Sequence, residues 1–421
     1  MIKKLSIAVA TVISATALLT LIPACSNEWQ DFNGEKLAAN EVRVNVRDGE
    51  CFVRWSEVEG ADGYNIYRSE SRFGDYGKAN GDKLLKDNRY KTDVAKYSYY
   101  KITAVVDGEE IEVGEPVSTF TKNSLIASPF DDLSAVQNYI NVMHDELESG
   151  STGQFSSTRF AMMFLPGEYP QIEAKTGYYT SVIGLGSIPT DVTLNSLYVS
   201  TNVLSDNNST HTFWRGVENV TINSDTQWAV SQATSMRRVQ INGNLALSHP
   251  TGWSSGGFLA NSKITGSVNP GTQQQWMSRN DDWGSWLNNG GSHNLVFSGC
   301  VGETPQSVWS ESLGRYTNFE TTEKMAEKPF LVCDNYSDYK VFVPDVVANS
   351  KGTTWQNGIE AESGKFISLD DFYIADEKLD NDKTINEALK NGKHLLLTPG
   401  HYKLDAPIKI ERANTVVLGI G

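Results

Sequence analysis

Short segments with alternating apolar residues, most of them followed by Asn, Gly or Ser, recur through the middle of the chain. They include DVTLNSLYVST, ENVTINSD, RRVQINGNLALS, FLANSKITGSV and NLVFSGCVG. Alternation places every second side chain on one face of a strand, and Asn or Gly favours the bend that follows. The pattern therefore predicts a right-handed parallel β-helix, with about six or seven rungs between residues 155 and 302 at roughly 20 to 25 residues each.

A three-part series of sequence segments occurs twice in the same order along the chain. An amphipathic helix in SPFDDLSAVQNYINVMHDELES is followed by RFAMMFLPGEYP and then by TSVIGLG. Near the C-terminus a second helix in DKTINEALKNG precedes GKHLLLTPGHYKL and NTVVLGIG. The shared order indicates an internal duplication. Because a solenoid normally needs at least three stacked repeats, the second copy, which reaches Gly421 after one rung, is predicted to be an incomplete β-helix.

Residues 37–122 carry a different pattern, with short strands of period two separated by turn residues. VRVNVR turns through DG into CFVRW, and GYNIYRS and YYKITAV follow. These pieces resemble a fibronectin type III domain. In such a sandwich Trp55 and Tyr99 or Tyr100 are core and corner residues rather than a ligand platform. A spacer is the default role for this module, and carbohydrate binding is the alternative.

The N-terminus has the features of a secretory leader. Lys3 and Lys4 precede the apolar stretch LSIAVATVISATALLTLI, and Ala24 stands directly before Cys25. LIPAC resembles the lipobox of bacterial lipoproteins, in which the signal is cut before an acylated cysteine; an ordinary cleaved signal is the alternative. The polar segment after it, SNEWQD, resembles the export tether of surface lipoproteins in the Bacteroidetes. The expectation is a cell-envelope protein, lipid-anchored through Cys25 to the outer membrane and exposed at the surface.

Net charge and the positions of the Cys and His residues exclude some classes of binding partner. The chain of 421 residues has 36 Lys and Arg against 51 Asp and Glu, a net charge of −15 that repels phosphate backbones, so nucleic acid is disfavoured. Its four Cys and six His show no metal-ligand spacing, so no metal and no cofactor is predicted. The three internal cysteines are interpreted as buried core residues.

These patterns predict an all-β chain, in which a sandwich precedes a β-helix of the pectin-lyase type. We assign residues 1–24 to a signal peptide, 25–36 to a tether and 37–122 to the fibronectin type III-like sandwich. Residues 123–315 form the first β-helix with its N-terminal helix, 316–381 a strand-rich connector, and 382–421 the start of a second β-helix.

A set of longer strings resembles bacterial members of glycoside hydrolase family 55. The strings are FLPGEY, GYYTSVIGLGSIPTDV, FWRGVENVTIN, WAVSQATSMRRVQI, SSGGFLANSKITGSV, QQQWMSRN, EKPFL, YKVFVP, LLLTPGHYKL and TVVLGIG. The resemblance runs from residue 155 to residue 421 and implies two tandem right-handed β-helices that hydrolyse a β-1,3-glucan such as laminarin, with exo action, inversion and no metal. In that family the general acid belongs to the second β-helix, which places it beyond the C-terminus of this chain.

The resemblance also suggests site residues. In WAVSQATSMRRV and SSGGF, Gln232 and Ser255 are predicted to line the cleft and to hold the attacking water. Trp228 and Arg237 are candidates for contacts with sugar hydroxyls, although rung stacking and a salt bridge explain them equally well.

Acidic and aromatic residues in QQQWMSRNDDWGSW supply a second set of candidates. Asp281 and Asp282 are a carboxylate pair of the kind that an inverting glycosidase needs, and Trp276, Trp283 and Trp286 beside them could stack on sugar faces. Asn-Asp-Asp before Trp-Gly is also ordinary turn chemistry, and a solvated turn between rungs is the favoured interpretation.

Three functions are compatible with the sequence. The first is a surface lipoprotein that hydrolyses β-1,3-glucan and is complete only with a second β-helix. The second is a noncatalytic glycan-binding lipoprotein, and the third is an inactive truncated fragment. The expected partners are a polysaccharide, with β-glucan favoured, and a membrane through Cys25.

Overall fold

The structure is a computed structural model that describes residues 37–93, 96–148, 153–200, 207–287, 294–311 and 314–421. The predicted signal peptide, Cys25 and the tether lie outside the described residues. Within the described ranges, no helix is both long enough and apolar enough to cross a lipid bilayer.

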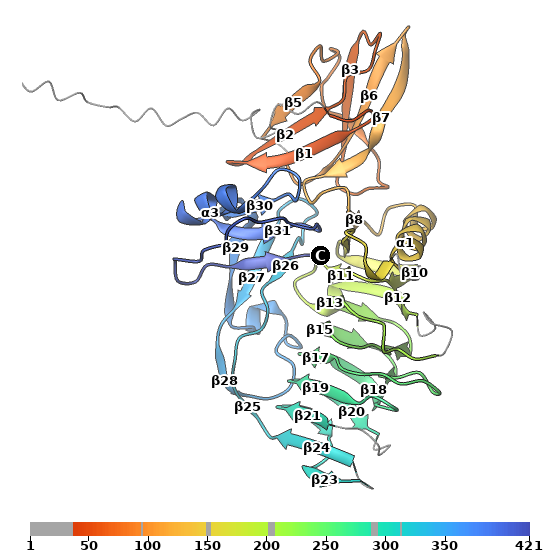
Figure 1. Cartoon of the computed structure of the whole chain (residues 1–421), viewed down its shortest axis with the longest axis vertical. Helices are drawn as coiled ribbons and strands as arrows, with labels where there is room; N and C mark the ends of the chain where they lie inside the picture. The colour runs from red at the N-terminus through yellow and green to blue at the C-terminus, as the bar shows by residue number, and fades with distance from the viewer. Residues whose placement is uncertain (1–36, 94–95, 149–152, 201–206, 288–293, 312–313) are drawn as a thin grey trace, which may run out of the picture. The chain divides into compact units, whose positions relative to one another are not determined.

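The N-terminal part is an antiparallel sandwich of two sheets (Figure 1). One sheet has the order β1-β2-β5 and the other β4-β3-β6-β7. Trp55 is fully buried between them and packs edge-on against Tyr64, with ring centroids 5.4 Å apart. Tyr99 and Tyr100 are buried as predicted; assignment to the fibronectin type III group stays a prediction. The strands are β1 (Val42–Arg47), β2 (Glu50–Trp55), β3 (Gly63–Ser69), β4 (Gly77–Lys78), β5 (Arg89–Thr92), β6 (Tyr99–Val106) and β7 (Glu109–Ser118).

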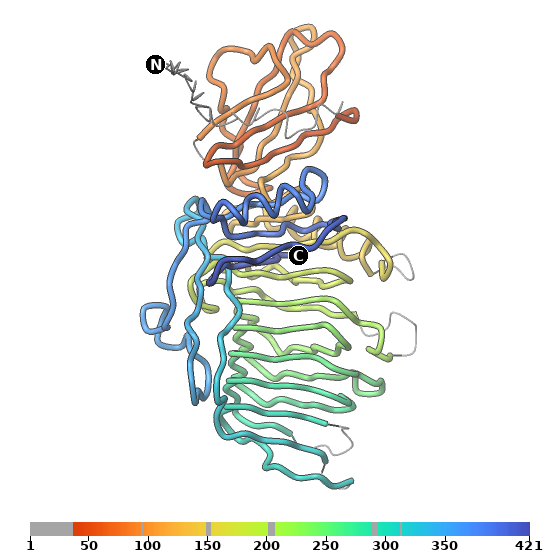
Figure 2. The backbone as a smooth tube through the Cα atoms, turned by 60° about the vertical axis from the view of Figure 1, so that its left-hand side comes forward, coloured from red at the N-terminus to blue at the C-terminus, as the bar shows by residue number. Residues whose placement is uncertain are grey.

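A parallel β-helix follows, and its rungs are visible as successive layers in Figure 2. One face is a column of strands in which each pairs in parallel with the next. The column is β8 (Ser124–Ala127), β9 (Phe160–Phe164), β11 (Thr180–Gly184), β13 (Arg215–Ile222), β15 (Thr234–Ile241), β17 (Phe258–Ala260), β19 (Gln275–Arg279), β21 (Asn294–Ser298) and β24 (Gly314–Phe319). Seven of these described strands, β9 to β21, lie between residues 155 and 302, as the sequence predicted.

The remaining strands of the first β-helix complete its other faces. They are β10 (Gly167–Thr176), β12 (Val192–Val199), β14 (Thr226–Gln227), β16 (Leu245–Ala246), β18 (Lys263–Asn269), β20 (Asp282–Trp286) and β22 (Val301–Glu303), with β23 (Val308–Ser310) antiparallel to β24. Helix α1 (Leu133–Glu148) covers β10 with its buried apolar face, as its 3.6-residue pattern predicts.

Inside the β-helix, side chains stack in register from rung to rung. Ile222, Ile241, Ile264 and Trp283 occupy one such column, since each pairs with the next across the parallel sheets. All four side chains are buried in one apolar cluster, so the inward side chains of each rung are covered by those of the next rung.

Residues in the left-handed backbone region turn the chain at one bend of four successive rungs. Asn219, Asn261 and Asn280 have φ values of 56°, 52° and 55° and are fully buried. Asn is one of the residues that tolerate this conformation, which confirms the predicted role of Asn at the bends. Arg238, with φ 51°, occupies the same bend in β15.

The connector runs back along these bends. It contains β25 (Thr322–Met325), β26 (Phe330–Val332), β27 (Lys340–Pro344), β28 (Val347–Ser350) and β29 (Gly364–Ser368), all paired antiparallel. Arg238 Nη1 donates to both Glu362 carboxylate oxygens at 2.8 Å, and both side chains are nearly inaccessible. Asn261 exchanges hydrogen bonds with Thr354. The bends therefore hold the connector against the β-helix.

A second parallel sheet repeats the start of the first. Strands β30 (Phe372–Ala375), β31 (His394–Leu397) and β32 (Val417–Gly419) pair in parallel with α3 (Asp382–Lys390) between the first two, just as α1 lies between β8 and β9. The hydroxyl of Tyr169 donates to Ala127 and Leu165 carbonyls, and that of Tyr402 to the matching Ala375 and Thr398 carbonyls. These equivalent contacts confirm the duplication.

Two predicted boundaries differ from the structure. The first β-helix continues through β24 to Phe319 instead of ending at residue 315, and the second parallel sheet begins with β30 at Phe372 instead of at residue 382. Both segments were recognised as strand-rich. Their parallel partners lie about 20 residues away at this repeat length, so local pattern alone does not assign them to a sheet.

Candidate functional site

Gln232 and Ser255 are brought together on the surface of the β-helix. Gln232 is exposed and lies just before β15; Ser255 is half-buried and lies just before β17, on the next rung. Gln232 Nε2 and Ser255 Oγ are 3.5 Å apart. The amide and the hydroxyl each offer donor and acceptor atoms, so the pair can bind a water molecule or a sugar hydroxyl.

The glycines of SSGGF allow this approach. The Gly257 Cα lies against Trp276, and a Cβ there would stand 2.1 Å from the indole ring. Gly256 has φ 99°, and its N–H donates to Gln273 Oε1 at 2.8 Å. The left-handed backbone and the close contact both require glycine here, and together they turn the chain so that Ser255 faces Gln232.

An aromatic stack beside this pair was not among the sequence candidates. Tyr179 and Trp214 lie parallel, 5.0 Å between centroids and 7° between planes, and the Arg159 guanidinium lies 3.6 Å from the Tyr179 ring centre. The Trp214 N–H donates to the Gln232 carbonyl at 3.4 Å, which places the stack one rung from Gln232. Trp214 is 37% exposed, and its indole is the accessible end of the stack.

Backbone strain is the signal that marks this stack. Tyr179 and Trp214 have φ values of 57° and 51°, a conformation that bulky residues rarely adopt. Such strain costs roughly 1 to 2 kcal/mol per residue and is retained most often at functional sites. Nothing in the single sequence marks these φ values, because Trp and Tyr carry no preference for that region.

Four tryptophans proposed as sugar contacts are instead core residues. Trp228, Trp276, Trp283 and Trp286 are at most 5% exposed and belong to the cluster that fills the β-helix interior. Trp283 and Trp286 lie 5.2 Å apart and both contact Phe297. Trp283 and Trp286 are three residues apart, and both face inward because the pairing of β18 with β20 shifts register between them. The prediction of sugar stacking is therefore wrong, and rung stacking is the right alternative for Trp228.

Asp281 and Asp282 do not form a carboxylate pair at a cleft. Asp281 is fully buried, where the backbone N–H groups of Ser262 and Arg279 donate to it at 2.9 and 3.1 Å. Asp282 points to the connector and accepts from Gln356 at 3.1 Å. The favoured interpretation, a solvated turn, is wrong for Asp281, because its carboxyl closes the bend from inside the β-helix.

Arg237 is held in an ion-pair network. Glu327 of the connector accepts from Arg237 at 2.8 Å and from Arg279 at 2.6 Å, and both guanidinium groups lie over the Phe258 ring. The Glu327 side chain is only 3% exposed. Arg237 therefore anchors the connector, which is the salt-bridge alternative. Among the described residues no group of three His, Cys, Asp or Glu is placed to hold a metal ion.

The burial of Asp281 gives a testable pH dependence. Desolvation raises the pKa of this carboxyl well above its ordinary value. Above about pH 4 the folded state therefore holds a proton that the unfolded state has lost, and the free energy of unfolding falls by up to about 1.4 kcal/mol per pH unit until the folded pKa is passed. In Asp281→Asn this contribution is absent, so the stability of the variant relative to wild type rises with pH. Urea unfolding between about pH 4 and 8 measures it.

Asp282→Asn is the matched control for this prediction, since it removes a neighbouring carboxyl that reaches the surface. The change in stability with pH should be larger for Asp281→Asn than for Asp282→Asn, because only Asp281 is fully buried. If the free energies of unfolding of Asp281→Asn and wild type changed in parallel with pH, the raised pKa of Asp281 would be contradicted.

Comparison with known proteins finds a matching family model and a similar sequence. Residues 372–421 match the family model of the LAM55 pectate lyase-like domain. An exo-beta-1,3-glucanase of Streptomyces sp. (strain SirexAA-E / ActE) is 45% identical over 274 residues, which are 64% of this chain and 44% of that protein.

Two solved structures share the fold. The structure of sacteLam55A from Streptomyces sp. SirexAA-E superposes with a TM-score of 0.66 and 41% identity, over 72% of this chain and 53% of the other. A variant of sacteLam55A in complex with glucose gives a TM-score of 0.65 with the same identity and coverage. The β-helical part of this chain is therefore similar to an exo-beta-1,3-glucanase and to sacteLam55A, and the chain spans about half the length of the relatives it matches.

Proposed function

We propose that this chain carries the first β-helix and the start of the second of a glycoside hydrolase that cleaves β-1,3-glucan of the laminarin type, with inversion. The observation that carries the proposal is the Gln232 and Ser255 pair, which is accessible and lies beside an exposed indole in a β-helix 45% identical to an exo-beta-1,3-glucanase. The glucose complex of the related structure supports a glucan as the ligand.

The two side chains suit the orientation of an attacking water. In inverting hydrolysis, water attacks the anomeric carbon from the face opposite the leaving group, and a carboxylate removes its proton while a carboxylic acid protonates the leaving oxygen. The Gln232 amide oxygen accepts one water hydrogen bond, and the Ser255 hydroxyl accepts or donates another. Neither group titrates, so both contribute by positioning the water. We assign the general acid to no residue of this chain.

We further propose that the protein is anchored to the cell envelope at Cys25 and exposed on the outer membrane. The lipobox-like LIPAC and the polar segment behind it support this location. A polymeric glucan is too large to cross the membrane unaided, so a glucanase at the surface would meet its substrate there.

Removal of the water-positioning groups should lower turnover and leave binding in place. In a protein that also carries a complete second β-helix with the general acid, Gln232→Ala and Ser255→Ala are each expected to reduce kcat on laminarin by roughly a hundredfold. KM should change by less than about threefold, because the water is bound chiefly in the transition state. Glucose release measured by a coupled assay gives both constants. Gln240→Ala, on the strand that follows Gln232, removes an amide that donates to Asn242; it is the control and should match wild type. A rise in KM alone would show that Gln232 binds substrate and does not position water.

Loss of the exposed indole should weaken retention of the polysaccharide. Trp214→Asn keeps a residue that tolerates φ near 51° while it removes the stacking surface, and we expect about a tenfold weaker affinity for laminarin in affinity electrophoresis. Trp309→Ala removes an indole that is 68% exposed on β23 and should leave the mobility unchanged. Retardation without any sugar release by wild type would favour the noncatalytic glycan-binding alternative.

Lipid attachment has a direct test. The wild-type chain, expressed in a Gram-negative host, should sediment with membranes and incorporate labelled palmitate. Cys25→Ser should do neither, because acylation requires the thiol. A soluble wild-type protein without label would overturn the proposed anchor.

A further inference from the structure

Equivalent aspartates close the first loop of each repeat. In the first copy the Ser128 N–H donates to Asp131 Oδ2 at 2.9 Å, directly after β8. In the second copy the Asp376 N–H donates to Asp380 Oδ2 at 2.8 Å, directly after β30. Because β8 and β30 hold the same place in their sheets, the two carboxylates are counterparts in the duplication.

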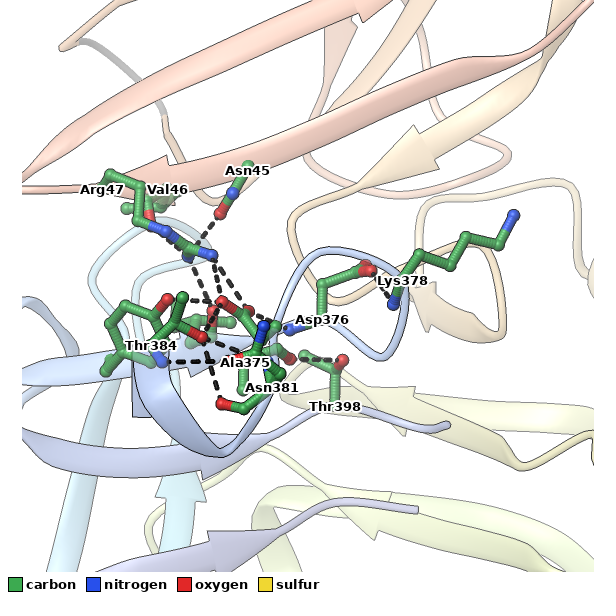
Figure 3. A network of polar contacts seen from close by, with 12 residues as sticks. Asn45, Val46, Arg47, Ala375, Asp376, Lys378, Asn381, Thr384 and Thr398 are labelled. Carbon is green, nitrogen blue, oxygen red and sulfur yellow. Dashed lines mark hydrogen bonds and ion pairs between the residues drawn. The ribbon is translucent and has the colours of Figure 1, made fainter. Parts of the chain in front are cut away.

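The sandwich contacts both aspartates. Ser71 Oγ, in the turn after β3, donates to the free oxygen of Asp131 at 2.5 Å. Arg47, the last residue of β1, places its Nη2 at 3.1 and 2.9 Å from the two oxygens of Asp380. Figure 3 shows Arg47 reaching from the sandwich toward the loop that carries Asn381 and Thr384; Asp380 directly precedes Asn381 in the chain.

The contact at Asp380 is buried and charged. The side chain of Asp380 is 1% exposed and that of Arg47 is 10% exposed. The guanidinium also donates to the Ile374 carbonyl at 2.9 Å and lies 4.4 Å from the Tyr373 ring centre. Within the described second repeat, Asp380 accepts from neutral groups: the Tyr373 and Thr384 hydroxyls and the Asp376 N–H. Arg47 thus supplies the cation that this buried carboxylate requires.

Further contacts join the sandwich to the first strand of each parallel sheet, or to the residues just before it. The Tyr99 hydroxyl donates to the Ser124 carbonyl at 2.8 Å and accepts from the Ile126 N–H at 2.9 Å, within β8. Lys96 and Tyr97 both bond to Asp370, two residues before β30. Tyr97 and Tyr99 belong to one apolar cluster with residues of both parallel sheets.

We propose that the sandwich is a clamp that fixes the second parallel sheet against the first β-helix, with Arg47 and Ser71 as positioning residues that engage the equivalent aspartates. The spacer role expected of such a module does not fit these contacts. On the proposed function, a cleft that depends on both β-helices would depend in turn on this clamp for its geometry. The inference about order in the second sheet stands on the contacts alone.

Hydrogen exchange followed by mass spectrometry tests the clamp on the whole chain. In Arg47→Met, amides of α3 and β31 should exchange at least tenfold faster than in wild type, while those of β13 to β19 keep their wild-type rates. Arg89→Met, which removes a mostly exposed cation on β5, is the matched control and should leave every segment unchanged. Ser71→Ala should accelerate exchange in β8 and the start of α1 instead.

The milder variant Arg47→Lys keeps the charge without the two-oxygen contact and covers the case in which Arg47→Met does not fold; it should give an intermediate rate in α3. Exchange in α3 and β31 within twofold of wild type for both Arg47 variants would overturn the proposal, since packing of the sheets would then suffice. Hydrogen exchange needs no hydrolysis, so the two proposals can fail separately. If only the glucanase proposal is wrong, the Arg47 variants still accelerate exchange in α3 and β31, but no sugar is released from laminarin.

Discussion

Parallel register between successive rungs is the constraint on which the rest of the molecule depends. Each strand of the main column can pair with its neighbour only if the side chains that point inward fit the layer before and after. Ile222, Ile241 and Ile264 satisfy this with like side chains, and Trp283 ends the column with a larger one. Because these stacked side chains fill the interior, polar groups can reach other parts of the chain or the solvent at the bends.

The bends then organise the parts outside the β-helix. Buried Asn and Arg side chains at one bend bind the connector, and the Arg238 to Glu362 pair is the most buried of these links. Removing one partner of a buried ion pair is costly, because the other charge is left buried and unpaired. The pair therefore specifies where the connector lies more than it adds net stability. A different bend, just before β13 and β15, carries the strained Trp214 and brings Trp214 and Gln232 to the surface.

Prediction from the sequence succeeded where the pattern was local and periodic. The β-helix, the amphipathic helix and the duplication were all visible, because alternation, 3.6-residue spacing and a repeated order are properties of short segments. The site was predicted less well. Gln232 and Ser255 emerged only through family resemblance, while Trp276, Trp283 and Trp286 were assigned to the surface although they fill the core.

The sequence by itself therefore determined the elements of this protein: alternating strands with Asn and Gly bends that must stack, and two copies of one starting unit. Only the tertiary structure decided which side of a strand faces inward at Asp281 and the tryptophans, and which partner satisfies each buried charge. The physical reason is that desolvation and ion pairing depend on residues far apart in the chain, as between Arg47 and Asp380, whereas strand and bend preferences are set by neighbours.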